Sequence, residues 1–189
     1  MEIYLIRHTV PKIAKGICYG QTDIELDETR FEEQVRTILH KLPPNLDRVY
    51  SSPLARCRRL AQRLPGPVEV DPRLMELDFG RWENKKWEEI DPETLGAWME
   101  DFVRAKAGKG ESYLDLHDRT VAFIEALSAK ARQDQCLAIV THAGNIRSFV
   151  SYLLGLPLEN SFRLQVEHGA VVKGTLGTSR PEHQLSLSC

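Results

Sequence analysis

Short apolar runs alternate along the chain with stretches of helical periodicity. The runs are rich in β-branched residues and bounded by turn residues, which is typical of strands. They cover residues 3–6, 49–51, 68–70, 136–141, 162–166 and 171–176. The pattern therefore predicts six short strands with helices between them.

Three stretches predict amphipathic helices, because their apolar residues recur every three or four positions. The first opens at Asp27, and its apolar residues at 31, 35, 38, 39 and 42 share one face. The second covers residues 116–131. The third covers 146–154 and should end at Gly155, with Pro157 two residues beyond.

Two further segments have weaker patterns. Residues 82–110 hold three tryptophans among many charged residues and predict a partly helical excursion. Residues 177–189 predict a loose C-terminal tail. The chain has 189 residues and no internal repeat, so we expect one domain over residues 1–189.

The alternation of strands and helices predicts an α/β fold, with helices on both faces of one sheet. In such folds ligands bind beyond the carboxyl ends of the strands, close to helix N-termini. Candidate functional residues should therefore lie where strands end.

Charge and cysteine content narrow the classes of partner. A net charge of −2 and a pI near 6.3 give no overall attraction to nucleic acid or anionic membranes. The chain shows no leader pattern and no apolar run long enough to span a bilayer, so a cytoplasmic location is expected. Its four cysteines, at 18, 57, 136 and 189, form no C-x-x-C pair and predict reduced thiols.

Basic residues and histidines follow the ends of predicted strands. Arg7 and His8 follow the first run, and His142 follows the run at 136–141, next to a helix N-terminus. After the run at 49–51, Ser52 reads as a helix N-cap, and Arg56 lies one turn into that helix. Two arginines and two histidines at one sheet edge predict a site for a dianion, most simply phosphate.

Each of these residues alone would more simply be structural or exposed. Together, however, three strand ends supply complementary groups to one edge, and that coincidence indicates a site. Histidines without such neighbours are predicted to be structural or exposed, and these are His40, His117, His168 and His183.

A phosphate site that also performs catalysis needs a proton donor for the leaving group. Glu76 is a candidate, because it precedes an aromatic-glycine turn after the third predicted strand. Asp78 is its rival, and local sequence alone does not choose between the two carboxyl groups.

Taken in order, these motifs resemble the histidine phosphatase superfamily, which includes the cofactor-dependent phosphoglycerate mutases. The resemblance covers roughly residues 1–150. It is carried by Arg7-His8, by residues 51–56, by residues 76–83, by Gly110-Glu111-Ser112 with Arg119, and by residues 141–144. The family implies a three-layer αβα sandwich with a mixed, mostly parallel sheet.

The resemblance also implies catalytic roles. His8 would be the nucleophile that becomes phosphorylated, and Glu76 the acid that protonates the leaving oxygen. Arg7, Arg56 and His142 would hold the phosphoryl oxygens. No metal ion or other cofactor is implied, because the arginines supply the positive charge.

The chain departs from the family pattern just after the nucleophile. Thr9 and Pro11 stand where glycine and threonine are usual, and Ala14 replaces an asparagine that often contacts phosphate. Thr9 itself or groups near Gln21 are expected to supply the missing hydrogen bonds. Ala143 replaces a glycine but keeps the backbone N–H.

Residues 16–23 resemble the corresponding loop of the α-ribazole phosphatases within this superfamily. That resemblance implies hydrolysis of α-ribazole 5′-phosphate in the assembly of the cobalamin nucleotide loop. A broad-specificity or mutase-like phosphatase, and an inactive protein that binds phosphorylated ligands, are the alternatives. The substrate-binding residues expected on this basis are Arg7, Thr9, Tyr19, Gly20, Gln21, Thr22, Arg56 and Ala143.

Overall fold

The computed structural model describes residues 1–130, 132, 134–177 and 184–186, and its centre is a mixed six-stranded sheet. The strand order is β3-β2-β4-β1-β5-β6. The first four strands of this order run parallel, and β5 and β6 are antiparallel to their neighbours. The bounds are β1 (Glu2–Arg7), β2 (Arg48–Ser51), β3 (Val68–Val70), β4 (Cys136–Thr141), β5 (Val171–Thr175) and β6 (Gln184–Ser186).

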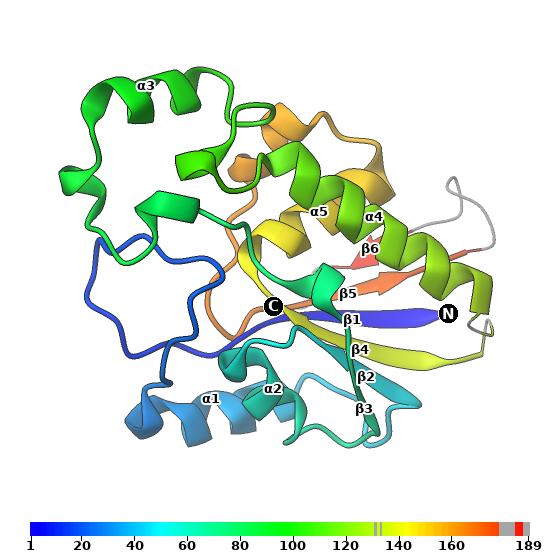
Figure 1. Ribbon diagram of the computed structural model, residues 1–189. Helices are drawn as coiled ribbons and strands as arrows, with labels where there is room; N and C mark the ends of the chain where they lie inside the picture. Colours follow the sequence, from blue (N-terminus) through cyan, green and yellow to red (C-terminus); the bar gives the residue numbers. More distant parts are fainter. Residues whose placement is uncertain (131, 133, 178–183, 187–189) are drawn as a thin grey trace.

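Helices cover both faces of the sheet, as Figure 1 shows. The α-helices are α1 (Glu28–Leu39), α2 (Ala55–Ala61), α3 (Pro92–Glu100), α4 (Tyr113–Lys130) and α5 (Ala143–Leu154). In Figure 1, α1 and α2 lie on one side of the sheet and α4 and α5 on the other. The predicted three-layer αβα fold is confirmed.

The pleat of β1 explains the three layers, because successive side chains point to opposite faces. Ile3 and Leu5 enter the core formed with α4 and α5. Tyr4 and Ile6 enter the core formed with α1 and α2. A strand that buries both faces is expected in the middle of a parallel sheet.

Helix ends follow the sequence signals in two cases and not in a third. The Asp27 side chain caps α1 by accepting from the Thr29 N–H at 3.1 Å, and Gly155 closes α5 in the left-handed conformation at φ 65°. The prediction that Ser52 is an N-cap is wrong, since α2 begins at Ala55. The Ser52 hydroxyl lies 2.9 Å from Nε2 of His142 instead.

The predicted strand at 162–166 is also wrong. A 3-10 helix, Leu158–Arg163, covers its first two residues, and residues 164–166 form no strand. The ring of Phe162 packs edge-on against Phe102 at 4.9 Å and lies 5.5 Å from Tyr113. Phe162 thus packs on aromatic rings, while Leu164 and Val166 contact the core formed with α4 and α5, so these apolar residues are buried without forming a strand.

Part of the expected C-terminal tail is ordered in the sheet. Gln184–Ser186 forms β6, which pairs with β5 in the register Thr175↔Gln184. The rest of that prediction, 178–183 and 187–189, lies outside the described residues.

The excursion at 82–110 is partly helical, as predicted, and it builds a small core of its own. Trp82, Trp87 and Trp98 pack on one another, with ring centroids 5.7 to 6.4 Å apart. This core includes Cys18 from the segment after β1. In Figure 1 the excursion and that segment lie together at the carboxyl ends of the parallel strands.

Glycine is required where two turns of the excursion meet. Gly80 and Gly108 both have positive φ, at 53° and 54°. A Cβ atom on Gly80 would lie 2.5 Å from the Gly108 carbonyl oxygen.

No helix among the described residues is long and apolar enough to cross a membrane.

Candidate active site

A pocket of about 220 Å³ opens at the carboxyl edge of the sheet. It is lined by the end of β1, by the segment that follows the 3-10 helix η1 (Pro72–Leu74) and by the N-terminus of α5. Its lining residues are Arg7, His8, Ile17, Tyr19, Glu76, Leu77, Phe79, Trp87, Tyr113, Ala143, Gly144, Arg147 and Phe162. Two predicted catalytic groups, His8 and Glu76, thus face the same small cavity.

His8 is held as a neutral imidazole with a defined tautomer. Its Nδ1 lies 2.7 Å from the Thr9 carbonyl oxygen, which can only accept, so Nδ1 carries the proton. Nε2 then holds the lone pair. Burial and the nearby charge of Arg56 keep the pKa of His8 well below its usual value. The ring is therefore neutral at neutral pH, and its Nε2 is able to act as a nucleophile.

Arg56 and His142 lie behind His8 and are fully buried. Arg56 donates to the carbonyls of Thr22 at 2.9 Å and Gly20 at 2.5 Å, and its Nη2 lies 3.3 Å from Nδ1 of His142. The rings of His8 and His142 are 5.1 Å apart. The Arg56 guanidinium places positive charge beside the nucleophile, and neither of these two predicted phosphate ligands is among the residues that line the pocket.

His168 belongs to this cluster, although the sequence analysis placed it among structural or exposed histidines. Arg7 donates through Nη2 to Nε2 of His168 at 2.9 Å and through Nη1 to the Val166 carbonyl at 2.5 Å. The rings of His168 and His8 are 5.3 Å apart. His168 lies three residues before β5, whose antiparallel direction brings its first residues to the edge where β1 ends.

The structure separates the two candidate acids. The Glu76 carboxylate accepts from the Gly144 N–H at 3.2 Å and from its neighbour Leu77 at 2.9 Å, and it lines the pocket. Asp78 is not among the lining residues. Its carboxylate accepts from the Gly80 N–H at 2.7 Å and so stabilises the turn at residues 78–80.

Arg119 fixes the segment that carries Glu76. It forms a two-pronged ion pair with Glu111, each N–O distance being 2.9 Å. It also donates to the carbonyl of Glu76 at 3.0 Å and to that of Met75 at 2.6 Å. Bidentate arginine contacts are directional, so the Arg119 side chain fixes the orientation of the backbone at Met75 and Glu76.

The predicted substrate loop is divided by the structure. Tyr19 lines the pocket, but Gly20, Gln21 and Thr22 do not. Glu83 accepts from the backbone N–H groups of Gln21 and Thr22, both at 2.8 Å. Hydrogen bonds from Thr22 and Gln21 outweigh burial, so the pKa of Glu83 lies below its usual value. The backbone N–H groups of Gln21 and Thr22 are therefore used by Glu83 and are not free to bind a substrate.

Two other predicted binding residues differ in their surroundings. Ala143 lines the pocket. Thr9 is fully buried, and its hydroxyl has no hydrogen-bond partner among the described residues. The backbone of Thr9 already orients His8, as described above.

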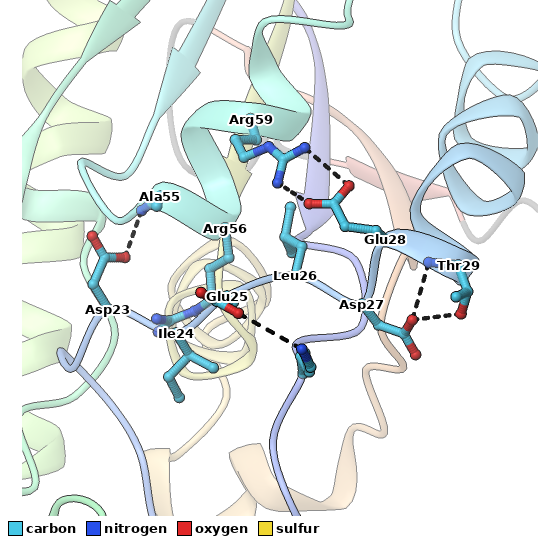
Figure 2. A pocket seen from close by; sticks show the side chains of 11 residues that line it. Asp23, Ile24, Glu25, Leu26, Asp27, Glu28, Thr29, Ala55, Arg56 and Arg59 are labelled. Carbon is cyan, nitrogen blue, oxygen red and sulfur yellow. Dashed lines mark hydrogen bonds and ion pairs between the residues drawn. The ribbon is translucent and has the colours of Figure 1, made fainter.

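A larger hollow of about 590 Å³ lies on another side of Arg56 (Figure 2). Asp23 accepts there from the Ala55 N–H at 2.7 Å, and Glu28 pairs with Arg59. Its lining also includes the acidic side chains of Glu25 and Asp27. Its four carboxylates outnumber its three cations, Lys12, Arg56 and Arg59. The smaller pocket has Arg7 and Arg147 against Glu76 alone and is the better site for a phosphate ester.

Arg147 is a further pocket residue that the sequence analysis did not single out. Its Nε donates to the Leu164 carbonyl at 3.0 Å, and its guanidinium lies 4.8 Å from the centre of the Phe162 ring. Burial lowers its pKa, and it makes no ion pair among the described residues. Its position on α5, one turn after Ala143, was the signal that could have found it.

The three neutral histidines should make the fold sensitive to acid. The pKa of His8, His142 and His168 is lowered by burial and then by neighbouring arginines, to about 4 for His168. The unfolded chain takes up protons near the ordinary value of 6.5, so stability is lost as pH falls below it. Each group then costs about 1.4 kcal/mol of unfolding free energy per pH unit.

We accordingly expect the Tm to fall steadily between pH 7 and pH 5, where most carboxylates are still ionised. His168→Gln removes one of the three groups and should flatten this dependence. A Tm that does not change over this range would contradict the assignment of neutral rings.

Comparison with known proteins identifies relatives over nearly the whole chain. The model of the histidine phosphatase superfamily (branch 1) matches residues 3–186. The adenosylcobalamin/alpha-ribazole phosphatase of Salmonella typhimurium is 31% identical over 180 residues, covering 89% of this chain and 87% of that protein. A protein of Hydrogenobacter thermophilus provisionally named phosphoserine phosphatase 2 is 28% identical, covering 91% of this chain and 88% of that protein.

A solved structure agrees with this relationship. The alpha-ribazole phosphatase from Shigella flexneri superposes with a TM-score of 0.85 at 27% identity. The match covers 99% of this chain and 95% of that one.

No three His, Cys, Asp or Glu side chains in the described ranges are grouped so as to hold a metal ion.

Proposed function

Because the chain belongs to the histidine phosphatase superfamily, we propose that it hydrolyses phosphate monoesters through a phosphohistidine on His8. The observation that carries the proposal is the arrangement of one pocket. It presents the lone pair of His8, the guanidinium of Arg7 and the carboxyl group of Glu76 together. A protein that only bound phosphate would need the arginine but neither the nucleophile nor the acid.

The first step would transfer the phosphoryl group to the enzyme. Nε2 of His8 forms a bond to phosphorus while the bond from phosphorus to the leaving oxygen breaks. Glu76, entering this step protonated, gives its proton to that oxygen. Phosphoryl transfer has a loose transition state, so the contribution of Arg7 is alignment and stabilisation of charge on the equatorial oxygens.

The second step would return the enzyme to its starting state. Water attacks the phosphorus of phospho-His8 and gives a proton to the Glu76 carboxylate. The N–P bond breaks, and inorganic phosphate leaves with the lone pair restored on His8. One carboxyl group therefore acts as acid and then as base, as microscopic reversibility requires.

For the substrate we propose α-ribazole 5′-phosphate. The proposal is supported by the Salmonella and Shigella relatives, whose names state that activity. It is also supported by the pocket wall, which is rich in aromatic rings suited to a planar base. These rings belong to Tyr19, Phe79, Trp87, Tyr113 and Phe162.

A second candidate is a phosphate monoester that also carries a carboxylate. Arg147 favours it, because this half-buried cation faces the pocket and has no acidic partner in the described ranges. Phosphoserine and 3-phosphoglycerate have such a group, and the Hydrogenobacter relative is named for the first.

The two candidates are separated by a substrate panel. We expect kcat/KM for α-ribazole 5′-phosphate to exceed that for phosphoserine, 3-phosphoglycerate, fructose 2,6-bisphosphate and phosphotyrosine. Arg147→Gln should then change kcat/KM for the ribazole ester by less than about threefold, because that substrate has no carboxylate for Arg147 to pair with. Loss of such a charge pair would lower kcat/KM by about 10-fold or more.

The opposite result identifies the second candidate. If a carboxylate-bearing ester is preferred, and Arg147→Gln selectively lowers its kcat/KM, the ribazole assignment fails. The phosphohistidine mechanism would stand in either case, because it does not involve Arg147.

A further inference from the structure

We propose that His168 is a positioning residue that orients Arg7 toward the phosphoryl group without cancelling its charge. The inference rests on the proposed phosphatase function of this pocket. It assigns a role to a histidine that is not among the five predicted catalytic residues, which are His8, Glu76, His142, Arg7 and Arg56.

The Arg7 guanidinium donates two hydrogen bonds to residues of one segment. Its Nη1 donates to the Val166 carbonyl at 2.5 Å and its Nη2 to Nε2 of His168 at 2.9 Å. Its Nε is buried and has no partner in the described part of the chain. The orientation of the guanidinium is thus set by residues 166–168, and His168 supplies the side-chain acceptor in that segment.

The same segment is tied to the end of β1. The Gly169 N–H lies 3.2 Å from both the Arg7 and the His8 carbonyl oxygens. His168 is therefore held beside the nucleophile by backbone contacts that do not depend on its own side chain. Substitution of His168 should change the hydrogen bond to Arg7 while leaving the backbone arrangement in place.

A neutral acceptor suits this position better than a carboxylate. Since Arg7 donates to Nε2, the proton of the His168 ring is on Nδ1. Burial and the charge of Arg7 lower its pKa to about 4, so the ring remains an acceptor at neutral pH. A carboxylate here would pair with Arg7 and place a negative charge beside an incoming dianion.

The hydroxyl of Tyr19 also approaches this ring, at 3.4 Å from Nε2. Tyr19 lines the pocket. The contact joins the loop after β1 to the segment before β5. It is longer than the bond from Arg7 and is secondary to it.

The test compares three substitutions of His168 with p-nitrophenyl phosphate as substrate. His168→Gln keeps a neutral acceptor and should stay within about threefold of the parent kcat/KM. His168→Leu should lower it about 10- to 100-fold, the scale of a misplaced binding group. His168→Glu should lower it further than leucine does. His40→Gln, at the exposed C-terminus of α1, is the matched control.

A double-mutant cycle separates positioning from a general structural role. In an Arg7→Ala background, His168→Leu should cause little further loss, because the arginine it orients is absent. The Tm of every variant is measured alongside. A folded His168→Leu variant with parent activity would overturn the proposal, and so would a loss that persists in full without Arg7.

Binding of inorganic phosphate, measured by calorimetry, keeps this outcome distinct from the proposed function. If the parent chain binds phosphate but hydrolyses no ester, the phosphatase proposal fails. The order of phosphate affinity among the glutamine, leucine and glutamate variants then still decides the role of His168. Equal affinities in all three would overturn it.

Discussion

Replacement of His8 by glutamine is expected to lower kcat/KM for every phosphate monoester by about 10⁴-fold or more, as loss of a covalent nucleophile does in other enzymes. The amide has no lone pair on nitrogen that could attack phosphorus. The parent protein, mixed briefly with radiolabelled ester and quenched, should retain label that is labile in acid and stable in alkali. The His8→Gln protein should retain none.

The design must distinguish lost chemistry from lost structure, because His8 is only 2% exposed and packs between two other imidazoles. Tm and phosphate binding report on folding, and His8→Asn is the second variant if glutamine is not accommodated. A folded variant that keeps substantial turnover would contradict covalent catalysis at this residue.

Glu76→Gln is expected to lower kcat/KM by about 10² to 10⁴ on alkyl phosphates, the usual contribution of a general acid. On p-nitrophenyl phosphate the loss should be much smaller, because nitrophenolate leaves without a proton. The second step would still lack its base. Rapid mixing with this substrate should therefore show a burst of nitrophenolate followed by slow turnover.

Two further variants test whether the carboxylate acts from its observed position. A Cβ atom on Gly144 would overlap the Glu76 carboxylate, so Gly144→Ala should displace it and reproduce part of the loss. Asp78→Asn keeps an acceptor for the Gly80 N–H and should leave the ratio of the two substrates unchanged. Equal losses on both substrates in Glu76→Gln would instead indicate that Glu76 only positions the substrate.

Local sequence was sufficient for the elements whose signals lie within a few residues. Asp27 and Gly155 mark helix ends because capping and left-handed closure involve only adjacent backbone. Arg7, His8 and His142 could be placed at one edge because parallel strands end on the same side. Ser52 was misplaced because its hydroxyl pairs with His142, 90 residues away in sequence.

The sequence by itself determined the αβα architecture and the positively charged strand ends, since both follow from periodicity and from the polarity of parallel strands. Only the tertiary structure decided which carboxyl group faces the pocket, because Glu76 and Asp78 are just two residues apart in the sequence. The side chain of Glu76 is directed by hydrogen bonds from Arg119 to its carbonyl and from the Gly144 N–H to its carboxylate. The tertiary structure likewise decided the place of His168. The sequence does not mark β5 as antiparallel, and that direction brings His168, in the segment before the strand, to the side of Arg7 and His8.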